Sequence, residues 1–486
     1  MIQNNIVDII DVEPRHYKTV KKILARFLPY KKVLAYGSRV NWNASETSDL
    51  DMVAFNCNSR QIYDVKDAFD ESNIPFIIQI LNWDNIPDDF KKNIEQKYHI
   101  LQRENDWGIF KLGEVAQLSK NAWKMGDEAL PYIGLDHIDE NKLRLNGFGF
   151  SDDVASSKCH FNQDSFLFGK LRPYFRKLIK PNFQGICSTD IWVVKSKEGN
   201  DLNYLFYLFS TEEFIDLSYS GSSGTRMPRA DWSFMKETSW EIPPLVEQKA
   251  IAEILSSLDD KIDLLHRQNK TLEEMAETLF RHYFIDNAKD DWKEGKLGDI
   301  CNVSGGYAFK SKDFIESGVP IVKIKNISNN RVDILGGQFV SNNLAKGIDD
   351  KYKLSDGDIV MAMTGATIGK VGLICSSDYN YLLLNQRVAV LRSKHQPLLW
   401  FLLNAINLED DILNLSNGAA QANISTFGIE EASAPKITEE HAKKFNEEVR
   451  PMFEKILSNQ KQIQTLEKLR DTLLPKLISG KIKVNY

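Results

Sequence analysis

Apolar residues recur every seven positions along two long segments of the chain, the spacing that buries one face of a helix in a coiled coil. In the first segment, the two seams are formed by Ile251, Leu258, Leu265, Leu272 and Leu279 and by Leu255, Ile262, Asn269 and Ala276. In the second, they are formed by Phe445, Met452, Asn459, Leu466 and Leu473 and by Val449, Ile456, Ile463 and Leu477. The pattern predicts two long helices, 244–285 and 438–480, and about 40 residues of helix span about 60 Å. We expect Pro451 to kink the first turns of the second helix.

Each predicted helix carries one asparagine, Asn269 or Asn459, at an otherwise apolar seam position. A polar residue at a single seam position costs stability but fixes the register and the number of partners. We therefore expect the two helices to pair antiparallel with the two asparagines at the same level. The alternative is that either asparagine faces solvent at a frayed seam.

The segments that precede the helices, 106–243 and 291–436, contain short apolar runs separated by Gly and Asn turns. This pattern is typical of mixed α/β domains built from short strands. Both segments open on Asp-Trp, at Asp106-Trp107 and Asp291-Trp292, and continue shortly with Lys-Leu-Gly. The sequence therefore contains two copies of one domain and its helix. Solenoid repeats have units of roughly 20 to 50 residues, so two whole domains are the simpler interpretation.

Residues 1–104 stand outside the duplication and predict a small α/β domain. The pattern places a helix at 17–27, strands at 33–36, 50–55 and 76–81, and a helix at 91–97. The whole chain is therefore expected to be an α+β multidomain protein with an N-terminal α/β domain, two mixed α/β domains and an antiparallel coiled coil of two long helices.

The net charge of −6 counts against nucleic-acid binding, but local charge matters more than the sum. No acidic residue lies between Asp164 and Asp190. The cations and aromatic residues that alternate there are Lys170, Arg172, Arg176, Lys177, Lys180, Phe168, Tyr174 and Phe175. This patch favours nucleic-acid contact, and the alternative is a solvated charged face with one of the aromatic residues in the core.

The five cysteines are scattered and never form a Cys-x-x-Cys pair, which favours reduced, buried thiols over a disulfide framework or a zinc site. The N-terminal residues lack the basic region and apolar run of a secretory signal. No apolar stretch approaches the roughly 20 residues that a membrane helix needs. We expect a cytoplasmic protein without a membrane partner.

An ordered set of motifs carries a resemblance to a known family. The first copy contains Phe-Gly-Lys-Leu-Arg-Pro-Tyr at 168–174, Gly-Ile-Cys-Ser-Thr-Asp at 185–190, Gly-Ser-Ser-Gly-Thr-Arg-Met-Pro-Arg at 221–229 and Ile-Pro-Pro-Leu at 242–245. The second contains Ser-Asp-Gly-Asp-Ile at 355–359, Thr-Gly-Ala-Thr-Ile-Gly-Lys at 364–370, Asn-Gln-Arg at 385–387 and Gly-Ala-Ala-Gln-Ala-Asn-Ile-Ser at 418–425. Over about residues 106–480, the chain resembles the specificity subunit of type I restriction-modification systems.

The resemblance implies a non-catalytic protein whose domains 106–243 and 291–436 each read one half of a bipartite double-stranded DNA target. The helices 244–285 and 438–480 would act as a ruler and dock methyltransferase subunits, with restriction and translocase subunits as further partners and no cofactor for this function. The residue types suit base contacts, since Arg and Lys pair with guanine, Asn and Gln with adenine, and Thr methyls touch thymine. The DNA-contact residues expected on this basis are Lys170, Arg172, Tyr174, Arg176, Thr225, Arg226, Arg229, Thr364, Thr367, Lys370, Gln421 and Asn423. Arg226 in one copy against Gln421 and Asn423 in the other predicts an asymmetric target.

Two catalytic motifs are absent from the duplicated region. The segment 365–370 resembles a phosphate-binding loop but is one residue short, and Val371 replaces the Ser or Thr that would hold magnesium. Ile242-Pro243-Pro244-Leu245 lacks the leading Asn of an adenine methyltransferase motif. Methyl transfer and ATP hydrolysis are therefore expected from partner subunits.

The N-terminal domain carries a second signature, Tyr36-Gly37-Ser38-Arg39 followed by Ser48-Asp49-Leu50-Asp51. It resembles the minimal nucleotidyltransferase domain of the polymerase-beta-like superfamily. The resemblance implies that Gly37, Ser38 and Arg39 bind a nucleoside triphosphate and that Asp49 and Asp51 are catalytic residues that share Mg²⁺.

The third carboxylate of that family is missing from this sequence. Gln79 and Asn82 stand on the later strand where an Asp is expected, and an amide cannot replace an anionic ligand or base. Three alternatives stay open for the domain: active transfer, a retained fold that binds nucleotide or serves in interactions, and ordinary strand-edge carboxylates. For the whole chain, the rival to a specificity subunit is a nucleotidyltransferase that acts on a protein or nucleic-acid substrate selected by the duplicated region.

Overall fold

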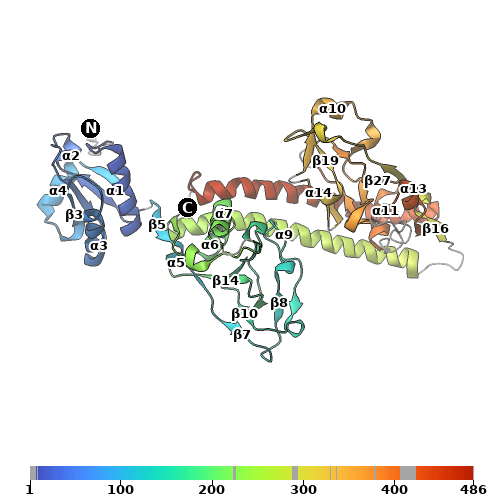
Figure 1. Cartoon of the computed structure of the whole chain (residues 1–486), viewed down its shortest axis with the longest axis horizontal. Coiled ribbons are helices and arrows are strands. Elements are labelled where there is room, and N and C mark those ends of the chain that lie inside the picture. Colours follow the sequence, from blue (N-terminus) through green and yellow to red (C-terminus); the bar gives the residue numbers. More distant parts are fainter. Residues whose placement is uncertain are drawn as a thin grey trace. The chain divides into compact units, whose positions relative to one another are not determined.

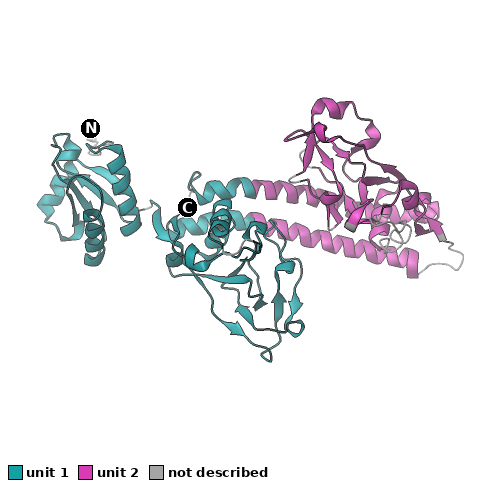
Figure 2. Cartoon of the chain, viewed as in Figure 1, with its two compact units in different colours: residues 1–257, 471–486 teal, residues 258–470 magenta. Residues whose placement is uncertain are grey.

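The computed structural model describes the chain except for residues 1–6, 8, 105, 223–225, 287–293, 329, 335–336, 377–378, 406–422 and 485–486. The chain divides into two compact units, residues 1–257 with 471–486 and residues 258–470 (Figure 2). We call them unit 1 and unit 2. The two long helices α9 (Leu245–Arg281) and α14 (Glu439–Ile478) each contribute residues to both units (Figures 1 and 2).

The N-terminal domain of unit 1 is a sheet with the order β3-β2-β1-β4, in which only β2 and β3 run parallel. Its strands are β1 (Val33–Tyr36), β2 (Leu50–Ala54), β3 (Ile78–Asn82) and β4 (His99–Gln102), and its helices are α1 (Pro14–Phe27), α2 (Ser38–Asn41), α3 (Ser59–Asp70) and α4 (Asp88–Gln96). Leu24 of α1 and Phe69 of α3 pack in one core, and Ile94 of α4 packs in another with Leu34 and Val53 of the sheet. The α/β class of this domain agrees with the sequence prediction, which missed α2, α3 and β4.

The first repeated domain, also in unit 1, has one sheet of order β12-β11-β14-β6 and another of order β7-β10-β13-β8-β9. Their strands are β6 (Ala116–Leu118), β7 (Ala122–Trp123), β8 (Pro131–Ile133), β9 (Gly149–Phe150), β10 (Lys158–Phe161), β11 (Phe166–Gly169), β12 (Leu178–Ile179), β13 (Gly185–Cys187) and β14 (Ile191–Ser196). A separate ribbon pairs β5 (Gly108–Lys111) with β15 (Ser239–Ile242). The helices are α5 (Leu112–Val115), α6 (Leu202–Phe209), α7 (Glu212–Ser220) and α8 (Trp232–Met235). An aromatic core around Phe168, Phe209 and Phe214 joins the first sheet to these helices.

Unit 2 repeats this topology. Its sheets have the orders β17-β27-β24-β25-β21-β20 and β18-β22-β19-β26-β23, and β16 pairs with β28. The strands are β16 (Glu294–Lys296), β17 (Asn302–Gly305), β18 (Phe314–Ile315), β19 (Val319–Val322), β20 (Ile327–Ser328), β21 (Asn330–Val332), β22 (Gln338–Val340), β23 (Lys353–Leu354), β24 (Ile359–Ala362), β25 (Val371–Leu373), β26 (Leu382–Leu384), β27 (Val388–Arg392) and β28 (Ser433–Pro435). The helices are α10 (Asn342–Lys346), α11 (Gln396–Ala405) and α13 (Thr426–Glu430). The four strands β25-β24-β27-β17 match β12-β11-β14-β6, so the duplication read from the sequence is also a duplication of fold.

The two long helices run antiparallel within each unit. In unit 2, Asn459 Nδ2 donates to Asn269 Oδ1 at 2.8 Å, and both side chains are buried. Arg470 Nη1 lies 2.8 Å from Asp259 Oδ1, and the rings of Phe280 and Phe445 make an edge contact, so residue numbers rise on one helix as they fall on the other. The predicted antiparallel pairing with the asparagines at one level is therefore confirmed.

In unit 1, the last turns of α14 pack against the first turns of α9. Leu474 and Leu477 share the aromatic core of the first repeated domain with Ile251 and Leu255. The helix α14 is continuous through Pro451, and α9 is followed by a π-helical turn at His282–Asp286. Among the helices that the structure describes, none is long and apolar enough to cross a membrane.

Candidate functional site

The chain leaves β11 through a tight turn that carries three of the cations predicted to contact DNA, Lys170, Arg172 and Arg176. Arg172 and Arg176 both adopt left-handed backbone conformations with φ of 50°, on either side of a short helix at Pro173–Phe175. Leu171 forms an isolated β-bridge with Arg229, and the Ala230 amide donates to the Lys170 carbonyl at 2.9 Å. The structure therefore brings the segment 226–230 beside the β11 turn.

The side chains in this region have different partners. Arg229 forms a paired contact with Asp190, with Nε 2.9 Å from Oδ1 and Nη2 3.3 Å from Oδ2. Arg176 Nη2 lies 3.9 Å from Glu212 Oε1, and Tyr174 is exposed with its ring against that of Tyr219.

The remaining cations of this region also differ. Lys170 is partly buried, and Arg226 is exposed. The Arg172 guanidinium lies 6.0 Å from the Phe175 ring centroid, and its buried Nε has no hydrogen-bond partner in the described part of the chain. Thr225 lies outside the described residues.

The equivalent region of unit 2 follows β24. Thr364 forms an isolated β-bridge with Asn423, and the Ile424 amide donates to the Met363 carbonyl at 3.0 Å. Thr367 belongs to a short helix at Gly365–Thr367, after which Lys370 is exposed. The structure therefore brings Thr364 and Asn423 together, while Gln421 lies outside the described residues.

Strand registers make the two regions comparable residue by residue. Gly169 faces Ile191 in unit 1, and Ala362 faces Val388 in unit 2. Counting from these pairs, Asp190 corresponds to Arg387. The two isolated bridges likewise make Arg229 the counterpart of Asn423. The sequence alone instead pairs Arg226 with Gln421 and Asn423. It also places Arg387 in the Asn-Gln-Arg motif but not among the predicted DNA contacts.

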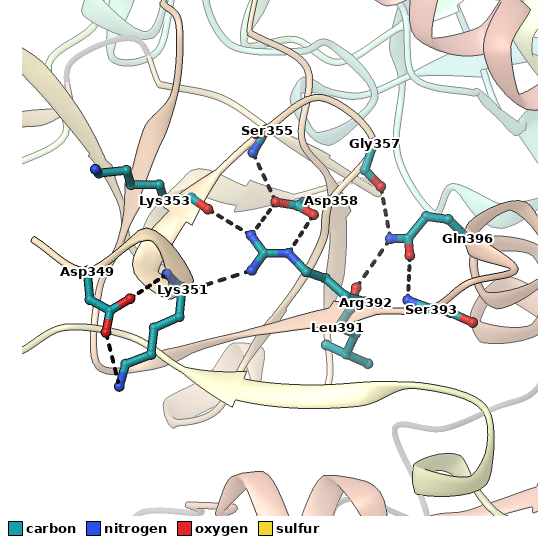
Figure 3. Close-up of polar contacts among 10 residues, drawn as sticks. All are labelled: Asp349, Lys351, Lys353, Ser355, Gly357, Asp358, Leu391, Arg392, Ser393 and Gln396. Carbon is teal, nitrogen blue, oxygen red and sulfur yellow. Dashed lines mark hydrogen bonds and ion pairs between the residues drawn. The ribbon is translucent and has the colours of Figure 1, made fainter.

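A polar network holds the base of the unit 2 region in place (Figure 3). Arg392 of β27 donates through Nε to Asp358 Oδ1 at 2.9 Å and through Nη2 to Asp358 Oδ2 and the Lys353 carbonyl, both at 2.7 Å. Gln396 Nε2 donates to the Gly357 carbonyl at 2.9 Å. These contacts tie the turn before β24 to β27 and α11, so Arg392 serves the scaffold.

The N-terminal domain places its two aspartates beside the glycine turn. Gly37 has φ +82°, and a Cβ there would lie 2.6 Å from Asp51 Oδ2, so only glycine fits. Asp51 lies between Tyr36 of β1 and Gln79 of β3, and Gln79 Nε2 donates to Asp49 Oδ2 at 2.6 Å. Burial and the neighbouring Asp49 raise the pKa of the Asp51 carboxyl. Burial and Asp51 in turn raise the pKa of Tyr36 to about 12.

Arg39 does not suit the predicted nucleotide contact. Its buried guanidinium donates to the Ser48 carbonyl at 3.0 and 2.7 Å and to the Asp11 carbonyl at 2.8 Å, and it lies 3.9 Å from the Phe76 ring centroid. A guanidinium committed to backbone acceptors and an aromatic face holds the fold together. Ser38 is the first residue of α2, directly after Gly37, and is partly buried.

Of the two amides on β3, only Gln79 lies beside the aspartates. Asn82 donates to the Cys57 carbonyl at 2.6 Å and accepts from the Asp84 amide at 3.0 Å, so it caps the following turn. The described residues contain no group of three His, Cys, Asp or Glu side chains able to hold a metal ion. Two carboxylates and an amide donor fit a divalent cation incompletely, because the Gln79 N–H group occupies an Asp49 oxygen that a cation would need.

The chain matches known proteins over both repeats. The family of the type I restriction modification DNA specificity domain matches residues 104–274 and 289–435. The MjaIX type I restriction enzyme specificity subunit of Methanocaldococcus jannaschii is 30% identical over 315 residues, which are 59% of this chain and 71% of that protein. The MjaVIII specificity subunit of the same organism is 27% identical over 438 residues, 81% and 97% of the two chains.

Two further similarities were found. A probable protein adenylyltransferase, MntA of Haemophilus influenzae, is 32% identical over 101 residues, which are 20% of this chain and 86% of that protein. A solved type I restriction-modification S subunit from M. genitalium covers 78% of this chain and 97% of its own, with 17% identity and a TM-score of 0.47. Because the matched family spans more than half of the sequence, this chain belongs to the type I restriction-modification DNA specificity family.

Proposed function

We propose that this protein directs a type I restriction-modification complex to a bipartite, asymmetric DNA target in the cytoplasm. Domain 106–243 reads one half of the target and domain 291–436 the other, while the helices 244–285 and 438–480 dock methyltransferase subunits. Restriction and translocase subunits complete the complex. The observation that carries this proposal is that two copies of one scaffold present different side chains at equivalent positions, Arg229 and Asp190 in one and Asn423 and Arg387 in the other.

Arg229 is the best-oriented base reader in unit 1. Its contact with Asp190 uses Nε and one side of Nη2, which leaves donors on Nη1 and Nη2 along the outer edge of the guanidinium. That edge matches the O6 and N7 acceptors of guanine in the major groove. The side chain is 43% exposed, so the edge is accessible while its orientation is fixed in advance.

The other proposed DNA contacts keep the roles inferred from the sequence. Thr364 and Asn423, which the structure brings together, form the corresponding base-reading pair in unit 2. The remaining proposed contacts are Lys170, Arg172, Tyr174, Arg176, Thr225 and Arg226 in the first domain and Thr367, Lys370 and Gln421 in the second.

Copurification and mapping of methylated DNA test the proposal. The tagged chain is expected to bring down a methyltransferase subunit, and sequencing of modified bases is expected to give two short motifs separated by a fixed gap. Replacement of residues 106–243 by the matching domain of another family member should change one motif and leave the other intact. An unchanged modified sequence after this swap would contradict the proposal.

For the N-terminal domain, we propose a nucleotidyltransferase-like module that binds a nucleoside triphosphate with Mg²⁺ and turns it over poorly. The 101-residue similarity to a probable protein adenylyltransferase has the length of this domain. The Gly37 turn and the Asp49–Asp51 pair support nucleotide binding, and Gln79 in place of a third carboxylate argues against efficient transfer. Label transfer from radioactive ATP that disappears in Asp49→Asn would instead establish an active enzyme.

A further inference from the structure

Three cations meet at one edge of unit 2, outside the set predicted from the sequence. The strands β19 and β26 run parallel with Val322 opposite Leu384, so the chain leaves both strands at the same edge. Lys323 and Lys325 follow β19, and Arg387 follows β26 after two residues. The Asn385 amide donates to the Val322 carbonyl at 3.1 Å, which holds the two exits together.

These cations lack an acidic partner in the part of the chain that the structure describes. Partial burial, then Lys325 and Arg387, lower the pKa of Lys323. Lys323 Nζ donates to Gln338 Oε1 and lies 4.1 Å from the Phe314 ring centroid, so its position is fixed by neutral groups. Lys325 and Arg387 are exposed. Like charges at one edge repel one another, and a bound anion offsets this repulsion.

The equivalent edge of unit 1 has the opposite charge. There the parallel strands β8 and β13 place Ile133 opposite Cys187, and the Ser188 amide donates to the Ile133 carbonyl at 3.0 Å. Counting from these matched pairs, Gly134 replaces Lys323, Asp136 replaces Lys325, and Asp190 replaces Arg387. The fold therefore forms this edge without a cation at any of these three matched positions, so Lys323, Lys325 and Arg387 are not needed for its architecture.

We propose that Lys323, Lys325 and Arg387 bind backbone phosphates of the DNA that unit 2 reads. The inference rests on the proposed function and adds a contact surface to it. Its place beside the base-reading pair is fixed by the backbone, because the Met363 amide donates to the Arg387 carbonyl at 3.0 Å and Thr364 bridges to Asn423. Phosphate contacts position a protein on the duplex, and base contacts specify the sequence. We call these three cations the cation cluster. By binding phosphates, the cluster would set the register in which Thr364 and Asn423 contact the bases.

Salt-dependent DNA binding tests the cluster. The full chain, copurified with its methyltransferase partner, is titrated with a fluorescent duplex that carries its mapped target at several salt concentrations. Each phosphate contact contributes about −0.9 to the slope of log K against log salt. Lys325→Ala and Arg387→Ala should each make the slope less steep by about one. Lys346→Ala removes an exposed cation at the end of α10 and should leave the slope unchanged.

Two further readouts distinguish phosphate binding by the cluster from base contacts. Arg387→Lys keeps the charge and should retain the wild-type slope, and the mapped methylated sequence should be the same for every variant. An unchanged slope in Lys325→Ala and Arg387→Ala, or an altered methylated sequence, would overturn the phosphate-binding role. If the wild-type complex bound no DNA at any salt concentration, the proposed function itself would fail.

Discussion

The role of each arginine in this protein depends on which acceptors surround its guanidinium. Arg39 is buried against the Ser48 and Asp11 carbonyls, and Arg392 is committed to Asp358 and a backbone carbonyl. Arg229 is held by one carboxylate and keeps an accessible edge. The sequence identifies all of these residues as cations but cannot assign their acceptors, which come from segments distant in the chain. For this reason the sequence groups Arg39 with the nucleotide contacts, although its guanidinium is committed to backbone carbonyls in the fold.

If Asp190 orients Arg229, removing the carboxylate charge should impair discrimination more than affinity. In Asp190→Asn, Arg229 keeps its charge but loses the paired contact that fixes its edge, so we expect a loss of about 1 to 3 kcal/mol of preference at one base pair. The measurement is competition binding between the mapped target and single-base variants. Lys120→Ala, an exposed change in the same domain, serves as the control. Equal weakening on every duplex would show that Asp190 does not orient a base reader.

The Asp49–Asp51 pair should lower the free energy of unfolding of the N-terminal domain at neutral pH. The folded-state pKa of Asp51 is raised, so the folded domain holds this proton more tightly than the unfolded chain. The ionised carboxylate is therefore unfavourable above the raised pKa, and the penalty fades as pH falls toward the ordinary aspartate value. Asp51→Asn should stabilise the domain at pH 7 by about 0.5 kcal/mol, after allowance for solvent screening.

Hydrogen exchange in peptides from residues 33–54 of the full chain would measure this effect. The gain in protection should be clear at pH 7 and small near pH 4, once exchange rates are corrected for pH. Asp67→Asn changes an exposed carboxylate on α3 and should show no such difference. A loss of protection in Asp51→Asn at pH 7 would contradict the conclusion that the ionised Asp51 carboxylate destabilises the domain.

At the scale of elements, long periodic segments were predictable and short strands were not. The heptads gave α9 and α14, and they also gave the level at which the helices pair, because a lone asparagine in each apolar seam needs a polar partner. The parallel pairs β8 with β13 and β19 with β26 were not predicted. Strands of three or four residues carry too little periodicity to show which partner they choose, and their pairing decides where Lys323 meets Arg387.

The paired asparagines should be strongly coupled in stability. Asn459 donates to Asn269, while Asn269 Nδ2 and Asn459 Oδ1 have no hydrogen-bond partner among the residues that the structure describes. Burying this polar layer therefore costs stability. Asn269→Leu alone should cost about 1 to 3 kcal/mol because it leaves the Asn459 amide with only the 3.4 Å contact to Gln268 Oε1. The double change to leucine should recover most of that loss, since two apolar side chains fill the seam.

A double-mutant cycle followed by hydrogen exchange within residues 258–280 would report this coupling. Leu264→Ala, on an exposed position of the same helix, gives the cost of a change outside the seam. Additive losses in the double variant would mean that the two asparagines stabilise the helices independently. The recovered stability should come with a less well-defined helix register, because the residue that fixes the register has been removed.

On the scale of the whole molecule, one scaffold occurs twice with chemically different side chains at equivalent positions. The duplication, the fold class and the helix pair follow from patterns repeated along the sequence. The difference between the copies emerges only when strand registers align them, because loops of unequal length shift Arg229 and Asn423 out of simple sequence correspondence. Arg229 against Asn423 then supports an asymmetric target, and Asp190 against Arg387 becomes an inversion of charge at one position of the fold.

The length of the helix pair should set the gap between the two half-sites. Leu265 packs with Ile463 and Asn269 bonds to Asn459, so these pairs form two neighbouring layers of the seam. One heptad can be inserted between these layers in each helix, at 265–269 of α9 and at 459–463 of α14. The two insertions together preserve the seam. Seven residues add about 10 Å of helix, equivalent to about three base pairs of DNA. Mapping of methylated DNA should therefore show both original motifs with a longer gap. Insertion into α9 alone shifts its seam residues relative to those of α14 and should abolish DNA modification. An unchanged gap in the double insertion would mean that the helices do not set the distance between the half-sites.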